Sequence, residues 1–168
     1  EVDDHHAILD TGCSDGSLLA YYARHFMIRA CGMVTDHALE DSIREKLGSQ
    51  AEILRADRLD IPWRDNSFHE VFVAFPLRNH PETGLFFREV LRVLKEKGQL
   101  LISVPCTPIL AQLGIKRRRS RENYVLTDPY QLMHILESCG FSEISMRISR
   151  LKYATVTARK SAFDSDSL

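Results

Sequence analysis

The sequence lacks any long apolar run, any paired-cysteine motif and any large excess of charge. No apolar stretch approaches the roughly 18 residues that a membrane-spanning helix needs, and no signal peptide is visible, so no membrane association is expected. The four cysteines, Cys13, Cys31, Cys106 and Cys139, are scattered, which predicts free thiols in a reducing compartment, the cytoplasm. A net charge of −1 argues against a general nucleic-acid binder, because such proteins usually carry a basic excess.

The remaining composition is that of an ordinary globular domain. Hydrophobic residues make up 44% of the 168 positions and charged residues 27%, enough for one buried core under a charged surface. We expect one domain over residues 1–160 and a disordered tail over residues 161–168. The adjacent His5 and His6 point different ways on most backbones, so no metal site is predicted.

Short apolar runs alternate with amphipathic stretches along the chain. The predicted strands cover residues 7–9, 28–34, 52–57, 68–75, 99–105, 143–149 and 151–159. The predicted helices are 18–26, a second capped by Asp36 and ended by Gly48, a third from Thr83 to Gly98, and a fourth from Thr127 to Gly140. The segment between the third and fourth strands has room for at most one helical turn. The last two strands would pair as an antiparallel hairpin, so the whole pattern predicts a doubly wound, mostly parallel α/β sheet.

The stretch AILDTGCSDGSLLAYYA, residues 7–23, is the most informative part of the chain. A buried strand ending at Asp10 leads into a turn with Gly12 and Gly16 and then into a helix. Ligands of doubly wound sheets bind at the carboxyl ends of the strands, where glycines allow close approach and a helix offers free N–H groups. Asp10 would add an acceptor for hydroxyl or amine groups. On its own this stretch also fits a tight turn that binds nothing.

Four segments in order resemble class I S-adenosylmethionine-dependent methyltransferases, in particular the small-molecule branch of ubiquinone and menaquinone biosynthesis. ILDTGCSDGSLL is similar to an acidic residue followed by G-x-G-x-G, and RADRLDIPWRDNSFHEVFVAF is similar to the stretch built around D-N-S-F-D. FFREVLRVLKEKGQLLIS resembles R-E-x-x-R-V-L-K-P-G-G-x-L-x-I-S, and LTDPYQLMHILESCGF resembles L-T-x-x-E-L-x-x-L-L-x-x-A-G-F. Their order and spacing are more specific than the glycine turn alone.

The resemblance implies a Rossmann-like sheet of seven strands, with an antiparallel last strand inserted between the fifth and sixth, and S-adenosyl-L-methionine as cofactor. The first turn would hold the methionine end of the cofactor, the end of the second strand its ribose, the end of the third its adenine, and the end of the fourth would approach the methyl-bearing sulfur. The implied cofactor-binding positions are Asp10, Gly12, Cys13, Ser14 and Gly16, then Val34 and Asp36, then Asp57, Arg58 and Leu59, and finally Phe75.

Three positions depart from the family pattern. Ser14 replaces the middle glycine, where a glycine-only backbone angle would add strain of ~1–3 kcal/mol. Val34 replaces the acidic residue that grips the ribose, which removes two charge-assisted hydrogen bonds worth ~1.5–3 kcal/mol each unless Asp36 replaces them. His69 stands where the D-N-S-F-D segment has its last aspartate.

The functional prediction is a methyltransferase acting on a small-molecule acceptor. A general base is needed only for a protonated oxygen or nitrogen acceptor; His80 is the first candidate, ahead of His69 and Tyr124. The first alternative is a methyltransferase-like domain with weakened cofactor binding that acts as a binding or regulatory partner. The second is RNA methylation, with the basic run Lys116–Arg119 gripping phosphates. The same run predicts an acidic acceptor, since arginine pairs well with carboxylate and phosphate, although a solvated surface loop is the more usual explanation of a charge run.

Overall fold

The computed structural model describes residues 6–74, 81–105, 129–149 and 153–161. The strands are β1 (Ala7–Asp10), β2 (Arg29–Val34), β3 (Glu52–Arg55), β4 (Phe68–Val73), β5 (Leu94–Pro105), β6 (Phe141–Ser149) and β7 (Tyr153–Lys160). The helices are α1 (Ser17–His25), α2 (His37–Leu47), α3 (Pro81–Val93) and α4 (Pro129–Cys139), with a short 3-10 turn, η1 (Gly48–Gln50), after α2. None of these helices is long and apolar enough to cross a membrane. The basic run, the predicted Thr127 cap and residues 162–168 lie outside the described residues.

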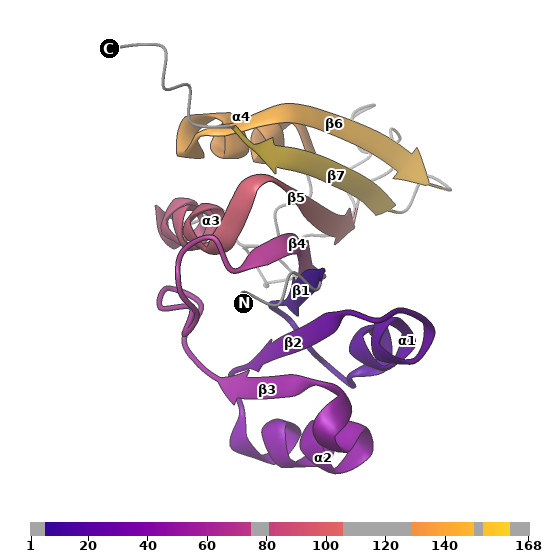
Figure 1. Cartoon of the computed structure of the whole chain (residues 1–168). Helices are drawn as coiled ribbons and strands as arrows, with labels where there is room; N and C mark the ends of the chain where they lie inside the picture. The colour runs from indigo at the N-terminus through magenta and orange to yellow at the C-terminus, as the bar shows by residue number, and fades with distance from the viewer. Residues whose placement is uncertain (1–5, 75–80, 106–128, 150–152, 162–168) are drawn as a thin grey trace, which may run out of the picture.

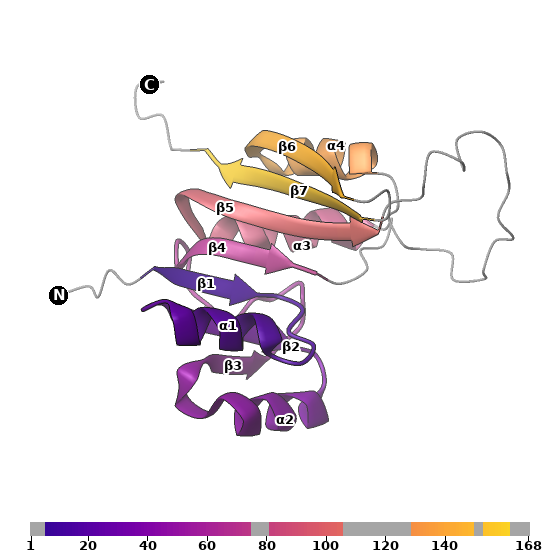
Figure 2. The ribbon, with the colours of Figure 1, turned by 90° about the vertical axis from the view of Figure 1, so that its right-hand side faces the viewer.

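All seven strands form one sheet in the order β3-β2-β1-β4-β5-β7-β6 (Figure 1). β7 is antiparallel to both of its neighbours, β5 and β6, so the other strands share one direction (Figure 2). This confirms the predicted doubly wound sheet, including the insertion of the last strand between the fifth and sixth. β1 lies between β2 and β4, which makes the carboxyl end of β1 the switch point where ligands of such sheets bind.

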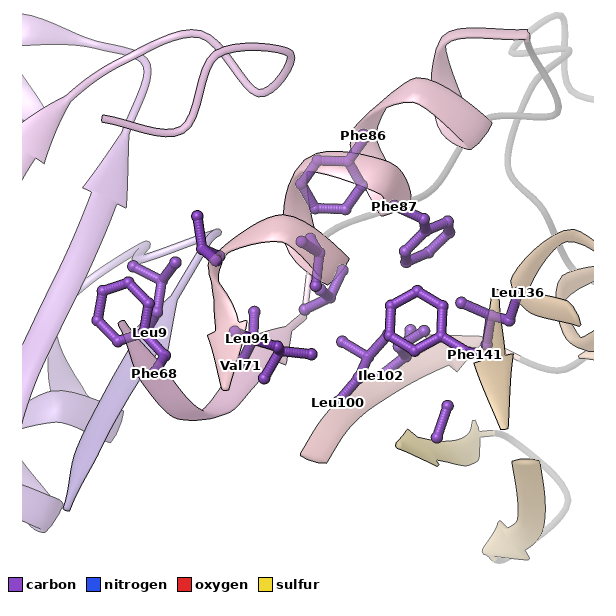
Figure 3. Close-up of a cluster of buried hydrophobic side chains, with 14 of the residues drawn as sticks. Leu9, Phe68, Val71, Phe86, Phe87, Leu94, Leu100, Ile102, Leu136 and Phe141 are labelled. Atoms are coloured by element: carbon purple, nitrogen blue, oxygen red, sulfur yellow. The ribbon is translucent and has the colours of Figure 1, made fainter. Parts of the chain in front are cut away.

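The two faces of the sheet build two separate cores, because successive strand residues point to opposite faces. Ile8 packs with Leu19 in the core beneath α1 and α2, whereas its neighbour Leu9 belongs to the larger core beneath α3 and α4. In that larger core Phe87 of α3 meets Phe141 of β6 edge to face at 6.5 Å (Figure 3). Phe87 is fully buried, and burial of such a side chain is worth ~1.5–3 kcal/mol.

The junction between α3 and β5 differs from the prediction. The helix begins at Pro81, so Thr83 is a buried residue of its first turn and not the cap. It ends at Val93, well before Gly98, because Leu94 already pairs with Phe68 of β4. The apolar periodicity of the sequence predicts a helix as far as Gly98, whereas pairing of Leu94 with β4 ends the helix at Val93.

Gly98 instead belongs to a bulge in β5. Residues 95–98 stand opposite the single residue His69, and pairing resumes with Gln99. A Cβ at Gly98 would lie 2.7 Å from the carbonyl oxygen of Lys95 and 3.2 Å from that of His69. Only glycine therefore fits here, for a reason that concerns the bulge and not the end of a helix.

The predicted helix boundaries are confirmed elsewhere by local geometry. Asp36 caps α2 by accepting from the Leu39 backbone N–H at 3.1 Å, and Gly48 follows the helix with φ of 54°. Gly140 ends α4 with φ of 100°. Each of these signals acts within a few residues of the chain, which is why the sequence alone could identify it.

The segment between β3 and β4 contains turns and no helix, as expected, and one arginine on α3 holds it in place. Arg92 donates to the carbonyl oxygens of Ile61 and Trp63 at 2.8 and 2.9 Å, and to Asp65 Oδ1 at 2.8 Å. Glu89 pairs with Arg92 and accepts from the Ile61 backbone N–H at 3.1 Å. The guanidinium therefore substitutes for the hydrogen bonds that a helix or strand would have given this segment.

Candidate functional site

The candidate site lies at the carboxyl ends of β1, β2 and β3. Adjacent backbone contacts bring the ends of these strands together: the Cys13 N–H donates to Met33 O at 3.3 Å, and the Ala56 N–H donates to Val34 O at 3.0 Å. The first turn, the end of β2 and the residues after β3 therefore share one edge of the sheet, at the right-hand ends of the parallel strands in Figure 2.

Asp10, the last residue of β1, carries the clearest electrostatic signature of this edge. Its side chain is 6% exposed, and Oδ1 accepts from the Gly12 backbone N–H at 3.0 Å. Burial raises the pKa of this carboxyl to about 6, the Gly12 hydrogen bond opposes the rise, and the negative charge of Asp15 adds to it. Within the described part of the chain no other donor reaches Asp10, and no fully buried side-chain oxygen lacks a partner. Oδ2 therefore remains open to a ligand.

The turn after Asp10 is held by hydrogen bonds to β4 on one side and to β2 on the other. Thr11 donates to Phe72 O of β4 through its backbone N–H and its hydroxyl, both at 3.0 Å. Cys13 lies beneath the turn with 1% exposure, where burial, followed by the charge of Asp10, raises the pKa of its thiol to about 12. Cys13 is therefore an unreactive packing residue, and its N–H is already used by Met33 O. Thr11 was missed by sequence reasoning because its partner is 61 residues away.

Two positions of the turn, Gly16 and Ser14, differ in whether the backbone requires glycine. Gly16 has φ of 70°, and a Cβ there would lie 3.0 Å from Ile43 and 3.1 Å from Leu47 of α2. Ser14 is exposed and is not among the described residues with positive φ. The positive-φ strain expected for a serine in place of the middle glycine is therefore absent.

One backbone N–H at the start of α1, that of Ser17, is already used within the chain. The Ser17 hydroxyl donates to Asp15 Oδ2 and the Ser17 backbone N–H donates to Asp15 Oδ1 at 3.0 Å, and these two hydrogen bonds lower the pKa of the Asp15 carboxyl. Lys46 of α2 donates to Asp15 O at 2.6 Å. Lys46 is a further residue that the sequence did not reveal, since its contact with the turn spans 31 positions.

The end of β2 offers no acidic group to a ribose. Val34 is 3% exposed and packs in the core beneath α1 and α2. Asp36 is exposed, but one of its carboxylate oxygens already caps α2. If Asp36 takes the place of the acidic residue that Val34 replaces, only the carboxylate oxygen that does not cap α2 is available to a ligand.

The residues after β3 suit an aromatic ring. Asp57 Oδ1 accepts from the Leu59 N–H at 2.8 Å, which closes a tight turn and leaves the exposed carboxylate with a second oxygen. The Leu59 side chain is 39% exposed, so an apolar surface is available beside this turn. Arg58 is exposed in the same turn and makes contacts of its own.

Two predicted site residues, Phe75 and His80, lie outside the described residues, as does Tyr124. His69, the other candidate base, lies at the beginning of β4, at the edge of the sheet opposite the first turn. Its Nδ1 accepts from the Ala7 N–H at 2.9 Å, and its ring stacks on His6 at 4.5 Å. It is therefore a packing residue and is wrong as a base for chemistry at the first turn. Within the described ranges no His, Cys, Asp or Glu grouping suits a metal ion.

The side chains at this edge fit the methionine end and the adenine of S-adenosylmethionine, and they leave the ribose without an acidic partner. The open oxygen of Asp10 suits the ammonium group of the methionine end, and Asp57 with Leu59 suits the adenine. Val34 supplies nothing to the ribose hydroxyls. Chemically, the arrangement can hold and orient such a molecule; it contains no activated nucleophile, because the Cys13 thiol remains protonated.

Comparison with known proteins agrees with this geometry. A family model described as "Methyltransferase domain" matches residues 9–102, more than half of the chain. The demethylmenaquinone methyltransferase of Porphyromonas gingivalis is 34% identical over 113 residues, which cover 62% of this chain and 45% of that enzyme. The chain thus spans less than half the length of this curated relative.

Solved structures show the same fold at low sequence identity. Phosphoethanolamine N-methyltransferase 2 of Haemonchus contortus, solved in complex with S-adenosyl-L-methionine, matches with a TM-score of 0.77 at 15% identity, over 96% of this chain and 50% of that one. The cyclase SpnF matches with a TM-score of 0.76 at 20% identity, over 96% of this chain and 77% of that one. A transferase and a cyclase share this architecture, so the likeness establishes the fold alone.

Proposed function

The chain belongs to the methyltransferase domain family, and from that premise we propose that it transfers a methyl group from S-adenosyl-L-methionine to a small-molecule acceptor. The observation that carries the proposal is Asp10, a buried carboxylate with one oxygen open at the switch point of the sheet. Similarity to a demethylmenaquinone methyltransferase supports a small-molecule acceptor.

The bound cofactor would supply an activated methyl group, and the share of this chain's residues is to bind and orient. Asp10 would fix the ammonium of the methionine end, and the backbone from Gly12 to Gly16 would lie against it. Asp57 would accept from the adenine amino group, with Arg58 and Leu59 beside the ring. Phe75 would approach the sulfur, and His80 would serve as base where the acceptor carries a proton.

The acceptor itself is proposed to be acidic and to be bound near the basic run Lys116–Arg119. Carboxylate and phosphate groups match the planar fork of arginine, so they would neutralise this concentration of cations. We also propose that the protein works in a reducing compartment, the cytoplasm, because Cys13, Cys31 and Cys139 are free thiols. Neutralisation of Arg117, Arg118 and Arg119 together tests the acceptor: it should cost turnover on acidic acceptors and leave neutral ones unaffected.

The experiment that tests the proposed function is a calorimetric titration of S-adenosylmethionine into the parent chain and into the Asp10→Ala variant. We expect saturable binding to the parent and loss of binding in the variant, with the fold preserved by circular dichroism. The exposed Glu45 on α2 gives a matched control, Glu45→Gln, which should bind like the parent. A parent that does not bind at millimolar cofactor would instead favour a methyltransferase-like binding partner, for which the buried Val34 is the specific observation.

A further inference from the structure

Three strained residues gather at the edge of the sheet opposite the candidate site. Among the described residues, the non-glycine residues with positive φ are Asn66 at 53°, Lys97 at 62° and Glu143 at 48°. They come from the turn before β4, the bulge of β5 and the start of β6, yet each meets one of two cations at the end of β7. Asn66 Oδ1 accepts from Lys160 Nζ at 2.9 Å, Lys97 O accepts from Arg159 Nη1 at 3.0 Å, and Glu143 Oε2 lies 3.2 Å from Arg159 Nε.

Such strain is informative because it costs free energy that another turn sequence would avoid. A non-glycine residue in the left-handed region is less stable than glycine there, although asparagine tolerates the region better than lysine or glutamate. Lys97 stands where the similar family segment, V-L-K-P-G-G, has its first glycine. A lysine therefore occupies a position that the backbone would prefer to give to glycine, and it places a third cation beside Arg159 and Lys160.

Lys97 and Glu143, together with the two cations of β7, line a surface hollow of about 300 Å³. Its walls are formed by Lys97, Ser142, Glu143, Arg159, Lys160 and Ser161. Three cations face one carboxylate, which leaves an excess of two positive charges, and the hydroxyl of Ser161 adds a neutral donor, whereas that of Ser142 donates to Arg159 O at 3.4 Å. The end of β7 lies beside the beginning of β5, where Arg159 pairs with Gln99, so the hollow is far from the first turn (Figure 2).

The ammonium group of Lys160 is held without an ionic partner. Nζ donates to Leu94 O at 2.8 Å and to Asn66 Oδ1 at 2.9 Å, both neutral oxygens. Partial burial lowers the pKa of Lys160, while the charges of Asp65 and Glu96 raise it from beyond contact distance. No carboxylate in the described part of the chain forms an ion pair with this group. Its third N–H is left for an anion.

We propose that this hollow, formed by Lys97, Arg159 and Lys160 with Ser142 and Ser161, binds a phosphate monoester. A monoester carries a charge of about −1.5 to −2 at neutral pH, which matches the excess of two positive charges. Arginine and lysine both form charge-assisted hydrogen bonds with phosphate oxygens, and the Ser161 hydroxyl adds one more donor. The proposal is independent of methyl transfer, since no residue of the candidate site takes part.

The organic part of the ester has an adjoining space. A second hollow of about 360 Å³ shares Lys97 and Arg159 with the first and continues towards His6, His69, Glu70 and Gln99. These walls are polar and include the carboxylates of Glu70 and Glu96, so they suit a hydroxylated group and disfavour a second anion. A small polar phosphate ester should therefore bind more tightly than inorganic phosphate.

The decisive variant is Lys97→Gly, because binding and folding should change in opposite directions. The Lys97 side chain forms no ion pair with a described residue, and glycine relieves the positive φ, so the variant should be at least as stable as the parent. Calorimetry at constant ionic strength, with inorganic phosphate and glycerol phosphate as probes, should show saturable binding to the parent and roughly tenfold weaker binding to Lys97→Gly. Lys160→Met should lose a similar factor.

Two further variants make the result specific. Glu143→Gln removes the one carboxylate of the hollow and should tighten phosphate binding several-fold, whereas Arg24→Gln, an exposed cation on α1, should change nothing. A phosphoserine peptide identifies which kind of phosphate monoester the hollow binds. Tighter binding of the peptide than of glycerol phosphate would assign the site to a phosphorylated protein. Weaker binding of the peptide would assign the site to a small metabolite. The proposal is overturned if the parent shows no saturable binding up to roughly 20 mM, a concentration at which a millimolar Kd would be detected, or if Lys97→Gly binds as well as the parent.

Discussion

Asp10→Asn should stabilise the protein at neutral pH while weakening its binding of the cofactor. The pKa of Asp10 rises from 3.8 to about 6 because the carboxylate is buried, and the single hydrogen bond from Gly12 offsets only part of the rise. Asparagine has the same shape, keeps an oxygen for the Gly12 N–H and cannot ionise. The substitution therefore removes the cost of a buried charge without creating a cavity.

The magnitude follows from proton linkage. Because the folded-state pKa is raised, the folded chain binds more protons than the unfolded chain between pH 3.8 and about 6. The contribution of Asp10 to stability is therefore highest below this window, falls as pH rises through it, and stays lower above it. A rise of about two pH units at ~1.4 kcal/mol per unit amounts to ~3 kcal/mol. For a chain of this size that corresponds to a Tm higher by roughly 6–12 °C in Asp10→Asn at pH 7.5.

The assay is thermal and urea unfolding of the parent, Asp10→Asn and Glu45→Gln from pH 4 to pH 8. The difference between the parent and Asp10→Asn should be near zero at pH 4 and should grow through pH 6, while Glu45→Gln should follow the parent. Cofactor affinity should change in the opposite direction, roughly tenfold or more weaker in Asp10→Asn above pH 6, through loss of a charge-assisted hydrogen bond worth ~1.5–3 kcal/mol. A stability difference that does not vary with pH, or an Asp10→Asn variant less stable than the parent at pH 7.5, would refute the reasoning.

Three further substitutions test other parts of the structure. Arg92→Met should lower the free energy of unfolding by about 2–3 kcal/mol in urea titrations, because it leaves the carbonyls of Ile61 and Trp63 without a donor; the exposed neighbour in Arg88→Met should cost little, and equal losses would contradict the assigned role. Val34→Asp should tighten cofactor binding in calorimetry yet lower Tm, since the new carboxylate starts from a site that is 3% exposed; unchanged affinity would indicate that Asp36 already holds the ribose. Gly16→Ala should destabilise by about 1–3 kcal/mol, as a Cβ meets Ile43 and Leu47 at a positive φ, and a neutral result would mean that the turn can relax.

The parts of the fold that could be predicted from the sequence depend on contacts between near neighbours. Asp36 caps α2 through Leu39, three residues away, and Gly140 ends α4 by its own φ. The end of α3 could not be predicted in the same way. Its apolar spacing runs on towards Gly98, but pairing between Leu94 and Phe68, 26 positions apart in the chain, ends the helix first.

In the candidate site, too, features set by near neighbours in the chain could be predicted, and contacts between distant segments could not. Asp10 could be predicted because strand, turn and helix follow one another in a short stretch, and its burial follows from that position. The sequence did not show that the Cys13 N–H is used by Met33, or that Lys46 crosses to Asp15. These contacts join segments 20 or more positions apart, and only the assembled sheet brings them together.

The family motifs of this chain do not all report on the same property. The R-E-x-x-R segment of α3 and the turn segment before β4 are joined by Arg92 and Glu89, whose partners are backbone groups and Asp65. Their role is to hold a loop, so their presence identifies the fold and says nothing about a ligand. The ligand-facing edge depends on other residues, and there the chain keeps Asp10 and Asp57 but has Val34 in place of an acid. Measured cofactor affinity, and not the number of matched motifs, is therefore the quantity that decides whether this member of the family catalyses methyl transfer.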